Sequence, residues 1–326
     1  MKIKKIIFKA REEASLETEE LPDAPLGNDE IAGATLVSAV SPGTELAVYR
    51  GLMKGGRFPC ASGYAAVFEV EHTGSNVKQF RPGDRVFCMG NHKSFQRVRE
   101  NDAVLVPHAL PAERAVFARL MSITMSTLVT TTARPPERVL VTGLGIVGYL
   151  AAQIFQSCGY NVLACDPSED RCKLALKNNI KNVLRAIPMD NPSVAGKIAL
   201  CVECSGHEQA VLDACKTIQK RGEMVLVGVP WARRTDLSAH DILSAVFHRY
   251  IVLRSGWEWE VPIHPTDFRA GSIMGNLAGA IEWIEEDKIR LDGIYTNHHP
   301  GEAQTVYQNL MRTHNCLLTA VFDWTS

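Results

Sequence analysis

The segment Gly143-Leu144-Gly145-Ile146-Val147-Gly148 constrains the fold of this chain more than any other. It directly follows an apolar run, Arg138 to Thr142, which comes after the breaker pair Pro135-Pro136 and is typical of a buried strand. After it, apolar residues recur at helical spacing, namely Val147, Leu150, Ala151, Ile154 and Phe155. A strand, a glycine turn and a helix in immediate succession predict the first unit of a parallel sheet.

Each glycine of this segment has a distinct physical use. Gly143 permits a tight turn, Gly145 lets the backbone approach a pyrophosphate, and Gly148 lets the helix pack closely on the strand. The first amides of the helix then point at the phosphates. The segment therefore predicts a dinucleotide site whose contacts include Leu144, Ile146 and Val147 as well as the glycines.

An acidic residue ends the next expected strand. Asp166 follows Asn161 to Cys165, at about the 20-residue distance where a carboxylate binds a ribose 2′-hydroxyl. Such a carboxylate repels a 2′-phosphate, which favours NAD, while Arg171 leaves some tolerance for NADP. The alternative is that Asp166 only forms a turn with Pro167.

Composition excludes several classes of partner. The chain has 326 residues, 46% hydrophobic and 22% charged, and its net charge of −1 provides no field for nucleic acid or anionic membrane. No apolar run approaches the about 18 residues of a membrane span, and no secretion signal is expected. The nine cysteines lie mostly in apolar stretches, as reduced thiols do. We expect a cytoplasmic protein acting on a small molecule.

The remaining patterns predict two domains. Short strands at 34–40, 64–71 and 85–88 make the first third β-rich, and a helix at 112–130 leads into the dinucleotide unit. Further parallel strands are expected at 198–203, 223–229 and 250–253, with a helix at 208–220, which gives five strands in all. The last expected elements are helices at 272–286 and 301–312 and strands at 291–295 and 317–323.

These last elements are too few for a third domain. We therefore predict that residues 266–326 return to a β-rich catalytic domain begun by residues 1–129, around a dinucleotide domain of residues 130–265. The fold class is α/β, a doubly wound Rossmann sheet inserted in a discontinuous β-rich domain.

Three blocks of the sequence resemble the medium-chain dehydrogenase/reductase superfamily. They are Val37 to Glu45 with Tyr49 to Gly51, then Gly63 to Gly74 with Phe80 to Val86, and then Val139 to Arg171. The resemblance implies a GroES-like catalytic domain, a Rossmann domain and a nicotinamide cofactor held between them. It also implies cofactor contacts at the next two strand ends, at Cys204, Ser205, Gly228 and Val229. The tail, from Leu291 to Trp324, is most similar to the subgroup that contains bacteriochlorophyllide dehydrogenases.

The chain departs from this superfamily at the metal positions. Many members bind a catalytic zinc through a Cys, a His with an adjoining Glu, and a later Cys or Glu. The resembling positions are Pro42, Tyr64-Ala65 and Met121, which cannot bind zinc in that way, and the four-cysteine lobe of a structural zinc is missing. We expect no zinc. The alternative, a zinc held by His92, Cys88 and Glu45, fits no familiar spacing.

Without a metal, another group must serve the reacting oxygen. Hydride transfer to or from a carbinol carbon requires a proton partner and positive potential at that oxygen. By resemblance, Thr44 matches the hydroxyl that begins the proton relay and Tyr64 replaces a metal-binding histidine, with His92 as a further relay group. The alternatives are a helix cap at Thr44, packing at Tyr64 and a loop histidine at His92. Glu45 is expected to be a structural partner.

The sequence thus predicts a zinc-independent, NAD-linked oxidoreductase that interconverts a secondary alcohol and a ketone on a small or medium polar substrate. Two alternatives remain open, an NADPH-linked quinone or enoyl reductase and a non-catalytic NAD-binding relative. The resemblance implies a homodimer whose sheets meet at Tyr250 to Leu253. Trp231, Trp257 and Trp259 are expected to line a pocket or an interface.

Overall fold

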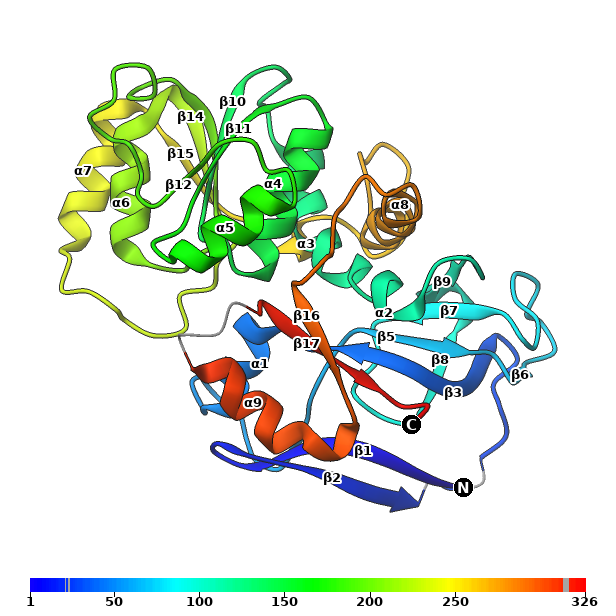
Figure 1. Ribbon diagram of the computed structural model, residues 1–326. Coiled ribbons are helices and arrows are strands. Elements are labelled where there is room, and N and C mark those ends of the chain that lie inside the picture. The colour runs from blue at the N-terminus through cyan, green and yellow to red at the C-terminus, as the bar shows by residue number, and fades with distance from the viewer. Residues whose placement is uncertain (21, 23, 313–316) are drawn as a thin grey trace. The chain divides into compact units, whose positions relative to one another are not determined.

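The computed structural model describes residues 1–20, 22, 24–312 and 317–326, which form two units. Unit 1 comprises Met1–Arg119, Leu277–Asp287 and Gly293–Ser326, and unit 2 comprises Leu120–Asn276 and Lys288–Asp292. Both ends of the chain lie in unit 1 (Figure 1). The division falls within helices α3 (Ala118–Thr130) and α8 (Ile273–Glu285), so it lies about ten residues from the boundaries expected at 130 and 265.

Unit 2 contains a six-stranded parallel sheet with the order β12-β11-β10-β13-β14-β15. This is the strand order of a doubly wound dinucleotide fold, so the predicted fold class is confirmed. Its strands are β10 (Arg138–Thr142), β11 (Asn161–Cys165), β12 (Val183–Leu184), β13 (Ile198–Glu203), β14 (Ile218–Leu226) and β15 (Val252–Ser255).

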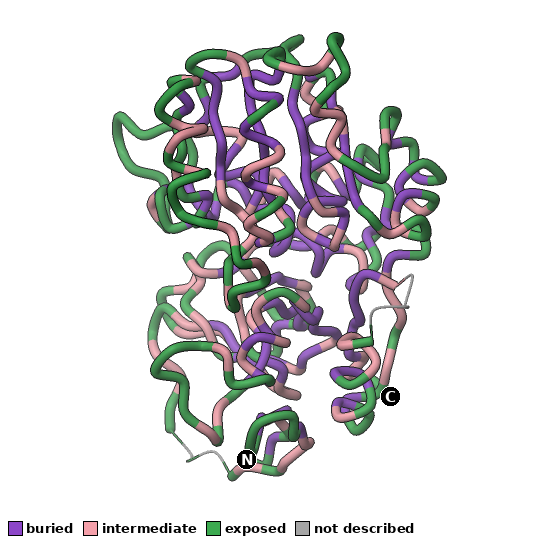
Figure 2. The backbone as a smooth tube through the Cα atoms, turned by 90° about the vertical axis from the view of Figure 1, so that its left-hand side faces the viewer, coloured by how far each residue is buried: buried purple, intermediate pink, exposed green. Residues whose placement is uncertain are grey.

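Helices cover both faces of this sheet, and Figure 1 shows α4 and α5 on one side and α6 and α7 on the other. Their bounds are α4 (Ile146–Ser157), α5 (Glu169–Lys177), α6 (Glu208–Thr217) and α7 (Ala239–Arg249). Because both faces are covered, the central strands are almost continuously apolar, and every residue of β13 is buried. The buried strands stand between more exposed helices in Figure 2.

The expected elements of unit 2 need three corrections. The sheet has six strands rather than five, because β12 is two residues long and too short to show a pattern. Helix α6 ends at Thr217 instead of 220, since β14 already begins at Ile218. Helix α7 was not predicted, and none of its residues is buried.

Unit 1 is built on sheets whose strands pair mostly antiparallel, while β16 and β17 pair in parallel. One has the order β16-β17-β3-β5-β7-β9, with β6 and β8 also paired to β3, and a smaller sheet has the order β2-β1-β4. The strands are β1 (Lys2–Ala10), β2 (Glu13–Glu20), β3 (Glu30–Ala39), β4 (Cys60–Ala61), β5 (Ala66–Glu69), β6 (His72–Thr73), β7 (Arg85–Cys88), β8 (Phe95–Arg99), β9 (Ala103–Val106), β16 (Tyr295–His298) and β17 (Thr319–Asp323).

The C-terminal strand β17 pairs with β3, Val321 opposite Ala39, so the last segment of the chain completes a sheet that begins with residues 30–39. Helices α1 (Pro42–Tyr49), α2 (Ala112–Ala115) and α9 (Ala303–Met311), together with most of α8, also belong to unit 1. The helix expected at 112–130 is divided into α2 and α3, and the strand expected at 291–295 begins only at Tyr295. The strand expected at 317–323 begins at Thr319. Among the described residues, no helix is long and apolar enough to cross a bilayer.

Candidate functional site

The glycine turn of unit 2 has the geometry that its sequence predicts. Gly143 has φ +82°, and a Cβ there would lie 2.9 Å from the Cα of Ser205. A Cβ on Gly148 would lie 1.8 Å from the carbonyl oxygen of Gly143, so only glycine lets α4 pack this closely on the turn.

Gly145 differs from these two glycines because the space beside it is open. A Cβ added to Gly145 would meet no heavy atom within 4 Å, and its φ of −62° suits any residue. Gly145 is also the N-cap of α4, and it has no side chain that could bind the first amides of the helix. The open space therefore adjoins a helix N-terminus, and the residues present fit the pyrophosphate of a dinucleotide.

Asp166 joins the end of β11 to the glycine turn. Its Oδ2 accepts a hydrogen bond from the Leu144 amide at 2.7 Å, and its Oδ1 accepts one from the Ser168 amide at 2.8 Å. The guanidinium of Arg171 lies 3.4 Å from Oδ2, and Arg185 donates to the carbonyl of Pro167. Asp166 thus contacts the glycine turn and also forms a turn with Pro167 and Ser168, as the alternative interpretation expected.

A second carboxylate, Glu203 at the end of β13, was missed by the sequence analysis. Its Oε1 accepts hydrogen bonds from Thr142 Oγ1 and from the amide and hydroxyl of Ser205, and the Gly206 amide also donates to it. Burial raises the pKa of Glu203, and these hydrogen bonds oppose that rise. The signal was available, because an acid between an apolar run and a Ser-Gly pair is unusual.

The ends of β10, β13 and β14 meet around Glu203. Its backbone carbonyl accepts hydrogen bonds from the amides of Val227 and Gly228, and the Cys204 amide donates to the carbonyl of Thr142. A Cβ on Gly228 would lie 2.4 Å from the Gly206 nitrogen, so the two turns pack backbone against backbone. The predicted contact Val229 follows and is 47% exposed.

In unit 1, Glu45 and His92 lie inside a closed hydrogen-bond network. His92 Nε2 lies 3.0 Å from Glu45 Oε2, and His92 Nδ1 lies 2.7 Å from Ser38 Oγ. The hydroxyl of Tyr307 donates to Glu45 Oε2 at 2.5 Å, and the indole of Trp324 donates to Ser38 Oγ at 2.8 Å. His92 lies in the loop between β7 and β8 and is fully buried.

Tyr64 forms a second cluster beside this network. Its hydroxyl donates a hydrogen bond to Ser41 Oγ, and the side chain of Thr44 is a further hydrogen-bond partner. The guanidinium carbon of Arg119 lies 4.9 Å from the centre of the Tyr64 ring. Burial raises the pKa of Tyr64, while the bond to Ser41 and the charge of Arg119 oppose that rise.

The structure brings the predicted residues Thr44 and Tyr64 together. His92 is linked to them through Glu45, whose Oε1 accepts a hydrogen bond from the Ser41 amide at 2.7 Å. Helix α1 begins at Pro42, so Thr44 lies within its first turn and does not cap a helix that begins at Glu45.

Two members of this cluster, Ser41 and Arg119, were not among the predicted site residues. Ser41 is next to Pro42, and Arg119 is two residues before Met121, so both flank positions that resemble metal-binding ones. Their contact with Tyr64 joins segments far apart in the chain, which spacing alone could not reveal.

The residues at the positions that resemble metal-binding ones do not provide the ligands of a zinc site. Pro42 and Ala65 carry no side-chain donor, and Met121 has only a weakly binding thioether. Within the part of the chain that the structure describes, no three His, Cys, Asp or Glu side chains are grouped to hold a metal, which excludes the set Cys88, His92 and Glu45. Burial also raises the pKa of Cys88 to about 12, so its thiol stays protonated.

Comparison with known proteins relates both units to dehydrogenases. Residues 147–256 match the family model described as zinc-binding dehydrogenase. The chain is 24% identical over 210 residues to an alcohol dehydrogenase of Geobacillus stearothermophilus, a match that covers 53% of this chain and 62% of that protein. It is 26% identical over 277 residues to an L-threonine 3-dehydrogenase of Streptomyces avermitilis, covering 70% and 80% of the two chains.

The fold also matches solved structures along its whole length. Galactitol-1-phosphate dehydrogenase from Escherichia coli superposes with a TM-score of 0.80 over 98% of this chain and 99% of the other, at 16% identity. At that identity the likeness establishes the fold.

Proposed function

We propose that this chain, which belongs to the medium-chain dehydrogenase/reductase superfamily, is an NAD-linked oxidoreductase that interconverts a secondary alcohol and a ketone without zinc. The substrate class is a small or medium polar organic molecule. The observation that carries the proposal is the open space at Gly145, next to the first turn of α4 and to the carboxylate of Asp166.

The residues that would hold the dinucleotide lie at the carboxyl ends of four parallel strands, β10, β11, β13 and β14. The amides at the start of α4 would bind the pyrophosphate, and Asp166 would accept from a ribose hydroxyl. Ser205, Gly228 and Val229 would border the cofactor beyond the glycine turn. When bound, the cofactor supplies a hydride acceptor or donor.

Cofactor preference is proposed to depend on Asp166. Its carboxylate favours the free 2′-hydroxyl of NAD over the 2′-phosphate of NADP. The half-exposed guanidinium of Arg171 and the exposed one of Arg185 add positive charge beside it, which supports some tolerance for NADP.

In unit 1, Tyr64 and Thr44 are proposed to serve the reacting oxygen. The misfit of Pro42, Ala65 and Met121 as ligands supports a reaction that does not use zinc. Tyr64 carries a hydroxyl proton that it can donate, and Thr44 and Ser41 hold that hydroxyl. His92 would act on this pair through Glu45 and the Ser41 amide.

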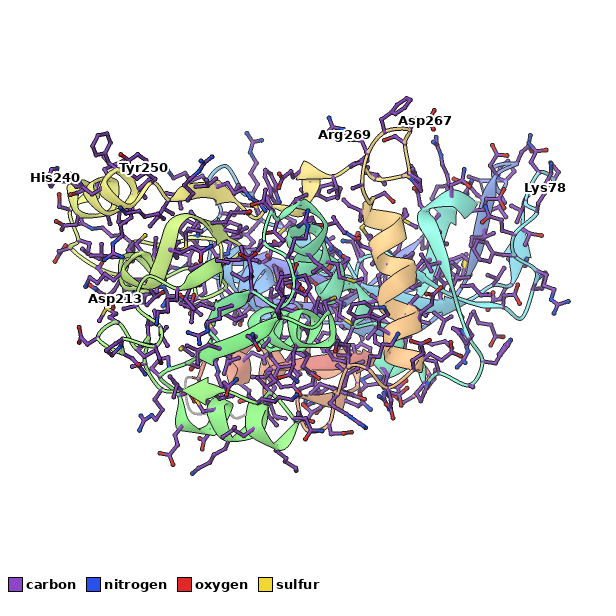
Figure 3. All side chains as sticks on the ribbon, turned by 90° about the horizontal axis from the view of Figure 1, so that it is seen from above. Lys78, Asp213, His240, Tyr250, Asp267 and Arg269 are labelled. Atoms are coloured by element: carbon purple, nitrogen blue, oxygen red, sulfur yellow. The ribbon has the colours of Figure 1, made fainter. Side chains whose placement is uncertain are left out.

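A homodimer is proposed to form at β15. This strand is the last in the parallel sheet, and Val252 and Leu253 are 49% and 37% exposed. Phe247 and Tyr250, which precede it, are also exposed, and Figure 3 shows Tyr250 at the outer surface of its unit. Sedimentation of the protein should give twice the chain mass, and a monomer would contradict this assignment.

The function is tested with a panel of secondary alcohols and ketones. Chelator-treated protein is mixed with each compound and with NAD(H) or NADP(H), and reduced nicotinamide is followed by absorbance. The proposal expects turnover with NAD(H) on at least one alcohol and ketone pair. Turnover only with NADPH on an activated alkene would instead identify a quinone or enoyl reductase, and cofactor binding without turnover would indicate a non-catalytic relative.

A further inference from the structure

Ser41, Tyr64 and Arg119 meet at positions that no comparison with known proteins assigns. Tyr64 follows Gly63 before β5, Ser41 precedes α1, and Arg119 is at the start of α3. All three belong to unit 1, and each is buried or half-buried.

We propose that Ser41, Tyr64 and Arg119 form a metal-free oxyanion site, in which Tyr64 is the proton donor and Arg119 provides the positive charge. Its ligand is the carbonyl or alkoxide oxygen of the substrate, and small carboxylates should occupy it in the same way. This inference rests on the proposed function and names the group that replaces zinc in it.

Arg119 has the electrostatic properties that the site requires. A guanidinium stays protonated at every accessible pH, and Arg119 is only 4% exposed, so its charge is weakly screened by water. Its guanidinium carbon lies 4.9 Å from the centre of the Tyr64 ring, where a cation interacts favourably with the aromatic face. The ring thereby holds the charge beside the phenol.

Ser41 supports the Tyr64 hydroxyl from a fixed backbone. Its Oγ accepts the Tyr64 proton in the present arrangement. Its amide is held by Glu45, which is in turn fixed by His92 and Tyr307. A serine hydroxyl is both donor and acceptor, so Ser41 can turn and donate to Tyr64 when Tyr64 donates elsewhere.

The three members of the cluster differ in exposure. Ser41 and Arg119 are buried, whereas Tyr64 is half-buried. Tyr64 is therefore the member that we assign to meet a substrate oxygen. Burial raises the pKa of Tyr64, so the hydroxyl keeps its proton until an alkoxide takes it.

In the direction of ketone reduction, Tyr64 transfers its hydroxyl proton to the substrate oxygen. When the carbonyl carbon accepts a hydride, which a bound reduced nicotinamide would supply, the π electron pair of the carbonyl moves to oxygen. The oxygen takes the Tyr64 proton, which gives the alcohol and a phenolate. Arg119 and the Ser41 hydroxyl stabilise the phenolate until water returns a proton, and alcohol oxidation reverses each step.

The test uses the full chain without cofactor, with fluorotyrosine at position 64 and acetate as the probe. In the fluorotyrosine protein with no other change, the fluorine NMR signal should shift saturably as acetate is added. Arg119→Lys should retain the shift, and Arg119→Met should weaken acetate binding at least about tenfold. The fluorotyrosine of Arg119→Met should also ionise about one pH unit higher or more.

Control variants separate this role from a structural one. Arg114→Met removes another arginine of unit 1, which pairs with Asp287, and should leave the acetate response unchanged. Ser41→Ala should raise the ionisation pH of fluorotyrosine while the fold, followed by circular dichroism, is kept. If Arg119→Met fails to fold, the proposal is still tested by the acetate response of Arg119→Lys and by the ionisation of fluorotyrosine in Ser41→Ala.

The inference is overturned if acetate produces no shift in the unsubstituted protein, or if Arg119→Met binds acetate and ionises as that protein does. NADH binding is measured in parallel. NADH binding without an acetate response would contradict this site but not the proposed function. An acetate response without NADH binding would contradict the proposed function but not this site.

Discussion

The Arg119 guanidinium carbon lies 4.9 Å from the centre of the Tyr64 ring, at a place where the chain resembles metal-binding dehydrogenases but has no metal ligands. A fixed cation and a protonated phenol can together serve an oxygen on which negative charge develops. The glycine turn of unit 2 and this pair are the two features on which the account depends.

Tyr64→Phe removes the proposed proton donor and keeps the ring over which Arg119 lies. We expect turnover to fall by about 10²–10⁴-fold, as for loss of a general acid, while NADH binding and thermal stability stay close to those of the wild type. Steady-state kinetics on the best substrate of the panel measure this. An unchanged rate would remove Tyr64 from the mechanism.

Asp166→Asn tests the basis of cofactor preference. An asparagine keeps an acceptor for the Leu144 amide, so the turn should be retained, while the charge that repels a 2′-phosphate is lost. The ratio of the NADPH and NADH dissociation constants should shift toward NADPH by about tenfold or more. If fluorescence titrations give the same ratio for both proteins, Asp166 does not set the preference.

Glu203→Ala should destabilise the protein. It leaves the buried amide of Gly206, along with the donors of Ser205 and Thr142, without their acceptor, which costs about 1–3 kcal/mol of unfolding free energy. Glu203→Gln retains one acceptor oxygen and should cost less. Urea unfolding compares the two variants, and equal losses would contradict the role given to the acceptor.

The pH dependence of stability follows from the same residue. Burial raises the folded-state pKa of Glu203 above its ordinary value of 4.5, so between these two values the folded state binds more protons than the unfolded state. The contribution of Glu203 to stability is therefore lost as the pH rises through the raised pKa. Glu203→Gln should lack this dependence, and identical pH profiles would contradict the assignment.

Metal analysis tests the zinc-free assignment. Purified protein should contain much less than one zinc per chain, and treatment with a chelator should change neither turnover nor thermal stability. Structural and catalytic zinc are held by three or four protein ligands, which this chain does not offer at the resembling positions. One zinc ion per protein chain would contradict the assignment.

The sequence predicted the dinucleotide unit best, because buried parallel strands and the glycine turn leave local patterns. Strand β12 was missed because two residues carry no periodicity, and β1 and β2 were missed because the lysines of β1 and the glutamates of β2 obscure their apolar residues. The contacts of Arg119 with Tyr64 and of His92 with Glu45 depend on how distant segments pack. Residue types suggested His92 and Tyr64, and only the fold showed what they contact.

The most direct test of the central claim compares NADH binding by the wild type with Gly145→Ala and Gly148→Ala. A Cβ at Gly145 enters open space, so this variant should fold normally and bind NADH at least about tenfold more weakly, because the methyl group occupies the place of the pyrophosphate. Gly148→Ala should instead lower thermal stability, because its Cβ would lie 1.8 Å from the Gly143 carbonyl. Fluorescence titration should show saturable NADH binding by the wild type that Gly145→Ala weakens. Absence of NADH binding by the wild type, or equal binding by Gly145→Ala, would contradict the account.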